Sequence, residues 1–543
     1  MTTPPDAAPT TTPSIGMPEP STAGIEHLIT AHQRELAQPG VLSVRPGYEI
    51  TDGWLTGRKA IVATVAAKLA DPPTGQALPE QIDGIPVDVR QASPLKRLAL
   101  TNPEAFAAQH RFAPNHGAPP VFGDEHVFTT TGALTAAAAV HPAARLPHKP
   151  SLIYTGATTP LTSVTAHMTL QLSASPDNGW PTLRPFLQNT QAELTVGLYD
   201  FTSAHILTTV QAALTGKTVQ LVLDHPAQNP TADQTDETTV ADLRAKLGDH
   251  LIQAWALTRT DPFAAAWIYP SAYHIKVAVQ DHQRLWLSSG NWNNANQPDI
   301  NPITTPTDAD AARDHDRDWH VIIDNPQLAA IFEAYLTHDL DVAAQHQLPA
   351  HDPGAPLQPP DPPSTRTPAF ARFFPTTTIT DQVTITPLLT PDPHNYADAV
   401  LALINSATTR LYLQYQYIEP PKTPSADNQP FQDLIAAVAA RQQAGIDVKI
   451  IMSEFETAGY LEQLQALGID VVNTVKIQNN VHNKGIIVDD TTVLVSSQNW
   501  SAAGTLQNRD AGVIITHPDA ATYYANLFLH DWNNLATRKV GDD

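Results

Sequence analysis

Two histidine–lysine pairs are the residues of this sequence best suited to chemistry. The first is His274-Ile-Lys276 and the second is His482-Asn-Lys484. A neutral imidazole can attack an electrophile or take up a proton, and a lysine ammonium can stabilise negative charge on oxygen. Residues two apart on a β-strand project from the same face, so each pair can point into one cavity.

Each pair begins a longer pattern, and the two patterns share one register. The pairs are followed by Asp281 and Asp489, and then by Ser-Ser-x-Asn-Trp turns at residues 288–292 and 496–500. Both 482 − 274 and 499 − 291 equal 208. A single His-x-Lys on a strand is usually a surface feature. Two copies in one register, each with an Asn turn, indicate a duplicated catalytic unit.

The elements that must position these residues repeat as well. An order of strand, helix and strand is expected over residues 192–223 and again over residues 409–452. This order is typical of sheets with parallel strand pairs and helices against their faces. The Ser-Ser-x-Asn turns follow strand ends, where α/β sheets bind ligands. The Trp292 and Trp500 side chains are expected to pack against the motif strands.

Composition divides the rest of the chain into expected domains. In order, these are a disordered tail (1–22), a small α+β accessory domain of unknown role (23–148), a first lobe (149–350), a Pro-rich linker (351–368) and a second lobe (369–543). The segments assigned to the tail and the linker are rich in proline, which favours loops over regular elements.

The charge and the amino-acid usage exclude several functions. A net charge of −23 disfavours nucleic-acid coating and anionic membranes. The chain has no cysteine, which excludes disulfides, thiolate metal sites and cysteine nucleophiles. No signal peptide and no apolar run of about 18 residues is visible. We therefore expect a soluble, cytoplasmic protein with at most peripheral membrane contact.

The duplicated pattern resembles that of the phospholipase D superfamily, whose mark is H-x-K-x4-D followed by a G-S or S-S-x-N turn. The resemblance covers residues 165–535 approximately. It implies an α/β fold with two lobes related by a pseudo-twofold axis and one active site in the cleft between them. Both lobes lie in one chain, so a monomer is expected. Gly290 and Gln498 differ between the copies, and we expect no loss of activity from this difference.

The resemblance also implies a role for each residue of the pattern. His274 is expected to be the nucleophile, forming a phosphohistidine, and His482 the general acid and base. The donors to the phosphate oxygens are expected to be Lys276, Lys484, Asn291 and Asn499, with Ser289 and Ser497 in substrate-binding turns. Asp281 and Asp489 are expected to anchor strand ends. The lysines replace a metal cation in this chemistry, so no metal and no cofactor is expected.

Two acidic residues complete the expected half-sites. Asp318 and Asp510 follow arginines in Arg-Asp elements and are expected to orient the histidines, with Asp318 in the half-site of His274 and Asp510 in that of His482. Asp318 lies 44 residues after His274 and Asp510 lies 28 after His482, so the first lobe carries a 16-residue insertion. We expect this insertion, around 296–310, to form a loop over the cleft.

The leading functional hypothesis is a phospholipase D-type enzyme that hydrolyses or transfers the phosphatidyl group of phospholipids, as in lipid catabolism. The alternative is a metal-independent nuclease or other phosphodiesterase acting on DNA or RNA. The intact His-Lys pairs disfavour a third hypothesis, a binding module without activity. The aromatic residues before the first pair are equally compatible with a lipid-facing or base-stacking lip and with core packing: Phe263, Trp267, Tyr269 and Tyr273.

Overall fold

The computed structural model describes most of the chain in two compact units. The described residues are 21–69, 73, 77–92, 97, 100, 126–128, 134–136, 155–224, 233–261, 264–267, 272–345, 366–392, 395–421, 424–453 and 458–538. One unit comprises Met1–Thr51, Leu55–Thr101 and Phe122–Ala139, and the other comprises the remainder of the chain. Most of the expected tail and linker, and the side chains of Phe263, Trp267 and Tyr269, lie outside the described residues.

The first unit is a small α+β structure, as the sequence predicted. Its elements are α1 (Thr22–Ala31), α2 (Gln33–Leu36), β1 (Val41–Thr51), β2 (Trp54–Val65), β3 (Gln81–Ile82), β4 (Ile85–Gln91), β5 (His126–Phe128) and β6 (Leu134–Ala136). The strand order is β3-β4-β2-β1-β5-β6. Ile25 and Ile29 of α1 are buried in one cluster with Val44 and Ile61 of the sheet, so the helix packs through one apolar face.

The second unit contains two lobes built from the same succession of elements. The first lobe consists of β7 (Val164–Ser175), α5 (Gly179–Gln188), β8 (Glu193–Leu198), α6 (Ala204–Ala213), β9 (Thr218–Leu223), α7 (Asp236–Leu247), β10 (Leu251–Trp255), the hairpin β11 (Leu257–Asp261) and β12 (Ala264–Trp267), β13 (Lys276–Gln280), β14 (Arg284–Ser288), α8 (Asp308–Ala311), β15 (Asp318–Asp324) and α9 (Pro326–Ala344).

The second lobe consists of β16 (Thr377–Thr390), α10 (Asn395–Asn405), β17 (Arg410–Tyr415), α11 (Gln429–Gln443), β18 (Asp447–Ser453), α12 (Ala458–Ala466), α13 (Val471–Thr474), β19 (Val475–Gln478), β20 (Lys484–Val488), β21 (Thr492–Ser496), α14 (Ala502–Leu506), β22 (Asp510–Thr516) and α15 (Pro518–Asn534). Apart from the β11–β12 hairpin, each strand of the first lobe has a counterpart in the second, which confirms the predicted duplication.

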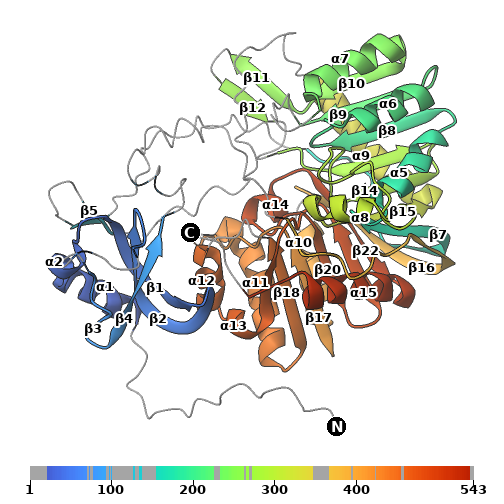
Figure 1. Ribbon diagram of the computed structural model, residues 1–543. Helices are drawn as coiled ribbons and strands as arrows, with labels where there is room; N and C mark the ends of the chain where they lie inside the picture. Colours follow the sequence, from blue (N-terminus) through green and yellow to red (C-terminus); the bar gives the residue numbers. More distant parts are fainter. Residues whose placement is uncertain are drawn as a thin grey trace. The chain divides into compact units, whose positions relative to one another are not determined.

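A single 14-stranded sheet runs through both lobes in the order β10-β9-β8-β13-β14-β15-β7-β16-β22-β21-β20-β17-β18-β19. Strands β7 and β16 pair antiparallel at its centre and join the lobes, as Figure 1 shows in teal and orange. The pairs β8–β9, β9–β10, β17–β18 and β18–β19 are parallel, and the other pairs within the lobes are antiparallel. The predicted mixed α/β fold is therefore confirmed.

The motif strands are buried on both faces. In β13, Val277 and Val279 belong to the cluster that contains α9, whereas Ala278 belongs to the cluster that contains α5, α6 and α7. Successive side chains of a strand point to opposite faces, so helices must cover both sides of the sheet. This explains why the motif strands read as continuous apolar runs without polar alternation.

The lobes share one hydrophobic core across their boundary. Trp319 of the first lobe is in the same buried cluster as Ile487 and Phe528 of the second. A Cβ atom on Gly485 would lie only 2.3 Å from Cζ3 of Trp319, so this strand position must be glycine while the tryptophan is present. In the equivalent pair with the lobes exchanged, Val277 stands at the position of Gly485 and Ala511 at that of Trp319. There the strand residue is the larger of the two.

Candidate active site

The two His-Lys pairs lie at equivalent positions of the two lobes. Lys276 begins β13, which runs between β8 and β14, and Lys484 begins β20, which runs between β17 and β21. Both lysines are fully buried, and His274 and His482 are 3% and 7% exposed. The central position of each strand in its lobe explains how such polar side chains are held inside the protein.

Each histidine is hydrogen-bonded to an aspartate of the opposite lobe. Nδ1 of His274 lies 2.9 Å from Oδ1 of Asp510, and Nδ1 of His482 lies 3.0 Å from Oδ1 of Asp318. The expected grouping of Asp318 with His274 and of Asp510 with His482 is therefore wrong. Because a carboxylate on Nδ1 fixes the tautomer and the ring orientation, each lobe orients the histidine of the other.

The backbone explains this exchange. The N–H of His274 donates to the carbonyl of Arg509 at 2.7 Å, and the N–H of His482 donates to the carbonyl of Arg317 at 3.1 Å. Short parallel bridges join Tyr273 to Arg509 and Arg317 to Val481. Each Arg-Asp segment therefore crosses the lobe boundary before it enters its own strand. Spacing along the chain could not predict this crossing.

The serines of the two turns hold the aspartates. The hydroxyl of Ser289 donates to Oδ1 of Asp318 at 2.7 Å, and that of Ser497 donates to Oδ1 of Asp510 at 2.6 Å. Both serines are fully buried. These hydrogen bonds give the serines a positioning role that the sequence did not predict, and their expected contact with substrate stays a prediction.

The turn asparagines are the next polar groups of the site. Asn291 is 5% exposed and Asn499 is 3% exposed. Within the described part of the chain, neither Oδ1 atom has a hydrogen-bond partner. The backbone N–H of Asn291 donates to Oδ1 of Asn296 at 2.9 Å, and Nδ2 of Asn296 donates to Asp316 at 2.7 Å. The first residues of the insertion thus brace the turn. Its predicted place over the cleft remains untested.

The surroundings of the two lysines differ. The ammonium of Lys276 lies 5.3 Å from the ring centroid of Tyr199, whereas that of Lys484 donates to Oε1 of Gln416 at 3.5 Å. Each ammonium also donates to the carbonyl of the histidine two residues before it. Burial lowers the pKa of Lys276 to about 7, against the opposing charges of nearby aspartates, and burial lowers the pKa of Lys484 well below its ordinary value.

The pKa values of Asp318 and Asp510 are shifted in opposite directions. Burial would raise the pKa of Asp318, but the charge and hydrogen bond of His482 outweigh burial and lower that pKa to about 2. Burial raises the pKa of Asp510 to about 7, although Lys276 opposes the shift. Burial and the Lys484 charge lower the pKa of His482 to about 4, so this imidazole is neutral near pH 7 when the site is empty.

The motif aspartates anchor strand ends, as predicted. Asp281 accepts backbone hydrogen bonds from Ala192 at 2.7 Å and Glu193 at 3.0 Å, at the start of β8. Asp489 accepts the corresponding bonds from Thr409 and Arg410 at the start of β17. Their φ angles are 51° and 50°, in the left-handed region that aspartate tolerates better than most residues.

The aromatic residues of the pattern pack in the core. Trp292 and Trp500 are each 1% exposed, and their rings lie 5.0 Å from those of Phe201 and Tyr415. Their predicted packing role is confirmed. Tyr273, which the sequence left open between a lip and the core, is fully buried.

Sequence reasoning missed His320, a further buried histidine of the first lobe. His320 is 1% exposed and lies between Ser175 Oγ at 2.8 Å and Ser288 Oγ at 2.7 Å. Burial lowers the pKa of His320 to about 4. Its counterpart in the second lobe is Gly512, so this histidine breaks the symmetry of the duplication. A search for shared residues could not find a residue that only one copy has.

Sequence reasoning also missed that the two arginines of the Arg-Asp elements are buried. Arg317 is 1% exposed and Arg509 is fully buried. Burial tends to lower the pKa of Arg317, but Asp177 and Asp531 outweigh it and raise that pKa above its ordinary value. The available signal was the arginine itself, which stands before the aspartate in both copies.

Two properties of the described residues bear on metal and membrane binding. Among them, no group of three or more His, Asp or Glu side chains is arranged to hold a metal ion. Over the same residues, no helix combines the length and the hydropathy needed to cross a bilayer.

Residues 400–532 match a family of known proteins described as "Cardiolipin synthase, PLD-like domain". No curated protein matches the sequence. Among solved structures, the phosphatidylserine synthase of Haemophilus influenzae Rd KW20 is 14% identical, with 69% of this chain and 90% of that chain covered and a TM-score of 0.46. The phospholipase D family member Nuc of Salmonella typhimurium is 22% identical, with 29% and 99% covered and a TM-score of 0.23.

Proposed function

We propose that the protein is a phosphodiesterase that hydrolyses or transfers the phosphatidyl group of a phospholipid, and the match of residues 400–532 to a PLD-like domain supports this proposal. One observation carries the proposal. Each His-Lys pair is buried at the lobe boundary, with its histidine held by a carboxylate of the opposite lobe. Neither lobe can orient its own histidine alone, so the two pairs act as one site.

The proposed reaction has two displacements. In the first, Nε2 of His274 attacks phosphorus, a phosphorus–nitrogen bond forms, and the bond to the leaving alcohol breaks. His482 gives its proton to the leaving oxygen. In the second, His482 takes a proton from water or from an acceptor alcohol, whose oxygen attacks phosphorus and releases His274. Water gives hydrolysis, and an alcohol gives transfer.

The lysines and turn asparagines are suited to the charge that develops. Negative charge grows on the non-bridging oxygens during each displacement, and fixed donors in a buried site stabilise it strongly. Lys276 and Asn291 would serve from the first lobe, and Lys484 and Asn499 from the second. Loss of one such donor typically lowers kcat about 10²- to 10³-fold.

The low pKa of His482 places a condition on its role as the acid. Near pH 7 this imidazole is neutral in the empty site, because burial and Lys484 disfavour the cation. A bound phosphodiester brings a negative charge next to the ring, and a nearby opposite charge raises a histidine pKa. Substrate binding must therefore raise the pKa of His482 enough for its ring to hold a proton near pH 7. If His482 remains neutral, it becomes the better nucleophile and the two roles exchange.

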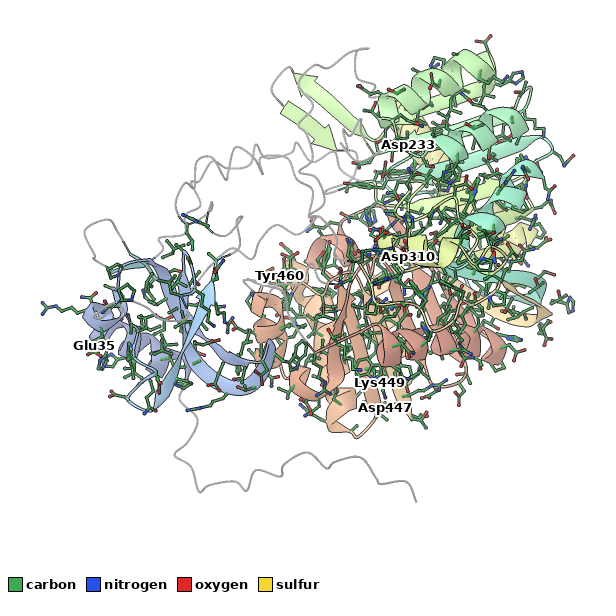
Figure 2. All side chains as sticks on the ribbon, viewed as in Figure 1. Glu35, Asp233, Asp310, Asp447, Lys449 and Tyr460 are labelled. Carbon is green, nitrogen blue, oxygen red and sulfur yellow. The ribbon has the colours of Figure 1, made fainter. Side chains whose placement is uncertain are left out.

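A nuclease would use the same residues, so the choice of substrate rests on the surface. The net charge is −23, and Asp233, Asp310 and Asp447 are carboxylates labelled on the second unit in Figure 2. Asp447 is paired with Lys449, and Asp310 is paired with Arg313 and Arg366, so the excess of negative charge lies in the chain as a whole. Long polyanions bind through cationic surfaces, so this balance favours a phospholipid.

One comparison of substrates tests the proposal. The purified protein is given phosphatidylcholine vesicles, single-stranded DNA and a chromogenic phosphodiester, all in EDTA. We expect cleavage of the lipid and the chromogenic diester, and loss of catalytic turnover in His274→Ala and His482→Ala. His27→Ala, on the exposed face of α1, is the matched control and should retain full activity. Cleavage of DNA without cleavage of lipid would establish the nuclease instead.

A further inference from the structure

Each catalytic histidine is linked to a second aspartate, on the last helix of its own lobe, through the arginine of the opposite lobe. Nη2 of Arg509 lies 2.8 Å from Oδ1 of Asp339, which belongs to α9 of the first lobe. Oδ2 of Asp339 accepts a hydrogen bond of 3.1 Å from the hydroxyl of Tyr273. Tyr273 precedes His274, and Arg509 precedes Asp510, which binds His274. Asp339 therefore links the side chains of the two residues that precede His274 and Asp510.

The second lobe contains the same arrangement with one substitution. Nε of Arg317 lies 2.8 Å from Asp531 of α15, and Nη2 lies 3.1 Å from the other carboxylate oxygen. The residue before His482 is valine, which has no hydroxyl. Gln414, on β17 next to the motif strand, instead donates to Asp531 at 3.0 Å. In both lobes the helix aspartate therefore accepts a second hydrogen bond, from Tyr273 in the first lobe and from Gln414 in the second.

These aspartates belong to the duplication. Both 531 − 339 and 509 − 317 equal 192, so the helix aspartates and the arginines share one register. The motif histidines are related by 208, and the difference of 16 is the insertion in the first lobe. Both helices carry the aspartate directly after a histidine, at 338–339 and 530–531. All four partners, Asp339, Asp531, Arg317 and Arg509, are at most 1% exposed.

We propose that Asp339 and Asp531 are positioning residues, each acting through the arginine of the opposite lobe on the catalytic histidine of its own lobe. The proposal rests on the catalytic roles given above to His274 and His482. Arg509 forms ion pairs with Asp339 and Asp392, and Asp339 also accepts a hydrogen bond from Tyr273, the residue before the histidine. Asp339 should therefore control the ring orientation of His274, whereas Asp392 should only balance charge.

The expected effect on His274 comes from geometry rather than from net charge. A hydrogen-bonded histidine–carboxylate pair tolerates little displacement, because a buried side chain has no water to replace the lost partner. Replacing Asp339 by asparagine keeps the shape but weakens the bond to Arg509. The Arg-Asp segment can then shift relative to Tyr273-His274. Residues that support a catalytic group in this way typically change activity about 10- to 100-fold.

The experiment compares Asp339→Asn with Asp392→Asn in the full chain. Both variants remove one carboxylate from the same arginine. With 15N-histidine labelling, the Nδ1 signal of His274 is assigned by its loss in His274→Ala. We expect Asp339→Asn to move this signal and lower kcat about 10- to 100-fold with KM nearly unchanged. We expect Asp392→Asn to leave both the signal and kcat within about twofold of the wild type.

A milder variant covers the case in which Asp339→Asn fails to fold. Tyr273→Phe removes only the hydroxyl that donates to Asp339. It should shift the His274 signal in the same direction and lower kcat several-fold. Asp531→Asn is the reciprocal test, and it should move the signal of His482 and leave that of His274 in place.

Two results would overturn the proposal. One is an unchanged His274 signal in both Asp339→Asn and Tyr273→Phe. The other is an equal effect of Asp392→Asn, which would mean that only charge balance matters. The nuclear magnetic resonance signals need no substrate, so they test the positioning role even if the protein cleaves no phosphodiester. Absence of all activity with intact signals would count against the proposed function alone.

Discussion

The exchange of aspartates between the lobes predicts which catalytic step each aspartate controls. In Asp318→Asn, the charged acceptor of His482 Nδ1 is replaced by a neutral amide of the same shape, in a fully buried position. A hydrogen bond to a charged group contributes about 1.5–3 kcal/mol, and about 1.4 kcal/mol corresponds to a factor of ten. The step that depends on His482 should therefore slow about 10- to 150-fold.

The assay uses a nitrophenyl phosphodiester, whose leaving group needs no proton. His482 then matters only for the second displacement, in which it takes a proton from water. In Asp318→Asn we expect a normal burst of nitrophenolate followed by slow turnover. In Asp510→Asn, which affects His274, the burst itself should disappear. Asp314→Asn, an exposed residue close in sequence to Asp318, is the control and should behave as the wild type.

The reversed pattern would refute this reasoning, provided that the phosphate is found on His274. Loss of the burst in Asp318→Asn, with a normal burst in Asp510→Asn, would mean that each aspartate serves the histidine of its own lobe. Identification of the phosphorylated residue by mass spectrometry is part of the assay, because a phosphate on His482 would exchange the roles of the two histidines and invert the expectation.

Three further predictions concern stability. His320 has a folded-state pKa of about 4 against an ordinary value of 6.5, so acidification below pH 6.5 favours the unfolded state, which binds the additional proton. Between pH 7 and pH 5, the unfolding free energy measured by urea titration should therefore fall by about 2 kcal/mol less in His320→Gln than in the wild type. Gly485→Ala should destabilise the protein by about 1–3 kcal/mol, because its Cβ would meet Trp319, and Trp319→Ala in the same chain should make the added methyl group nearly neutral. Asp281→Ala should lower the unfolding free energy by about 1–3 kcal/mol and leave kcat within about twofold, since the carboxylate caps the start of β8; a large loss of kcat in a folded variant would contradict its structural role.

Much of the fold and the site was predictable because the chain is duplicated. One copy of His-x-Lys on an apolar strand says little, but a second copy 208 residues later predicts paired lobes and names their shared residues. The strand-end role of Asp281 was also predictable, since it closes a motif strand. Such predictions depend on contacts that are local or that recur in both copies.

The remaining features depend on contacts that sequence spacing does not encode. Asp318 follows His274 in the same lobe, and only the crossing of the Arg-Asp segments places it against His482. The turn serines hold the aspartates of their own lobe across neighbouring strands, a pairing that spacing along the chain also does not encode. His320 has no counterpart in the second lobe, so the register of the duplication could not reveal it. Its role becomes visible only beside Ser175 and Ser288.

The central claim is that residues of both lobes form one phosphodiesterase site. The most direct test is rapid acid-free quenching of the enzyme with labelled phosphatidylcholine in EDTA, followed by mass spectrometry of the protein. We predict one phosphorylated residue, His274, which disappears in His274→Ala and accumulates in His482→Ala when a good leaving group is used. A protein that cleaves the lipid without any phosphohistidine, or with one in each lobe, would contradict the account.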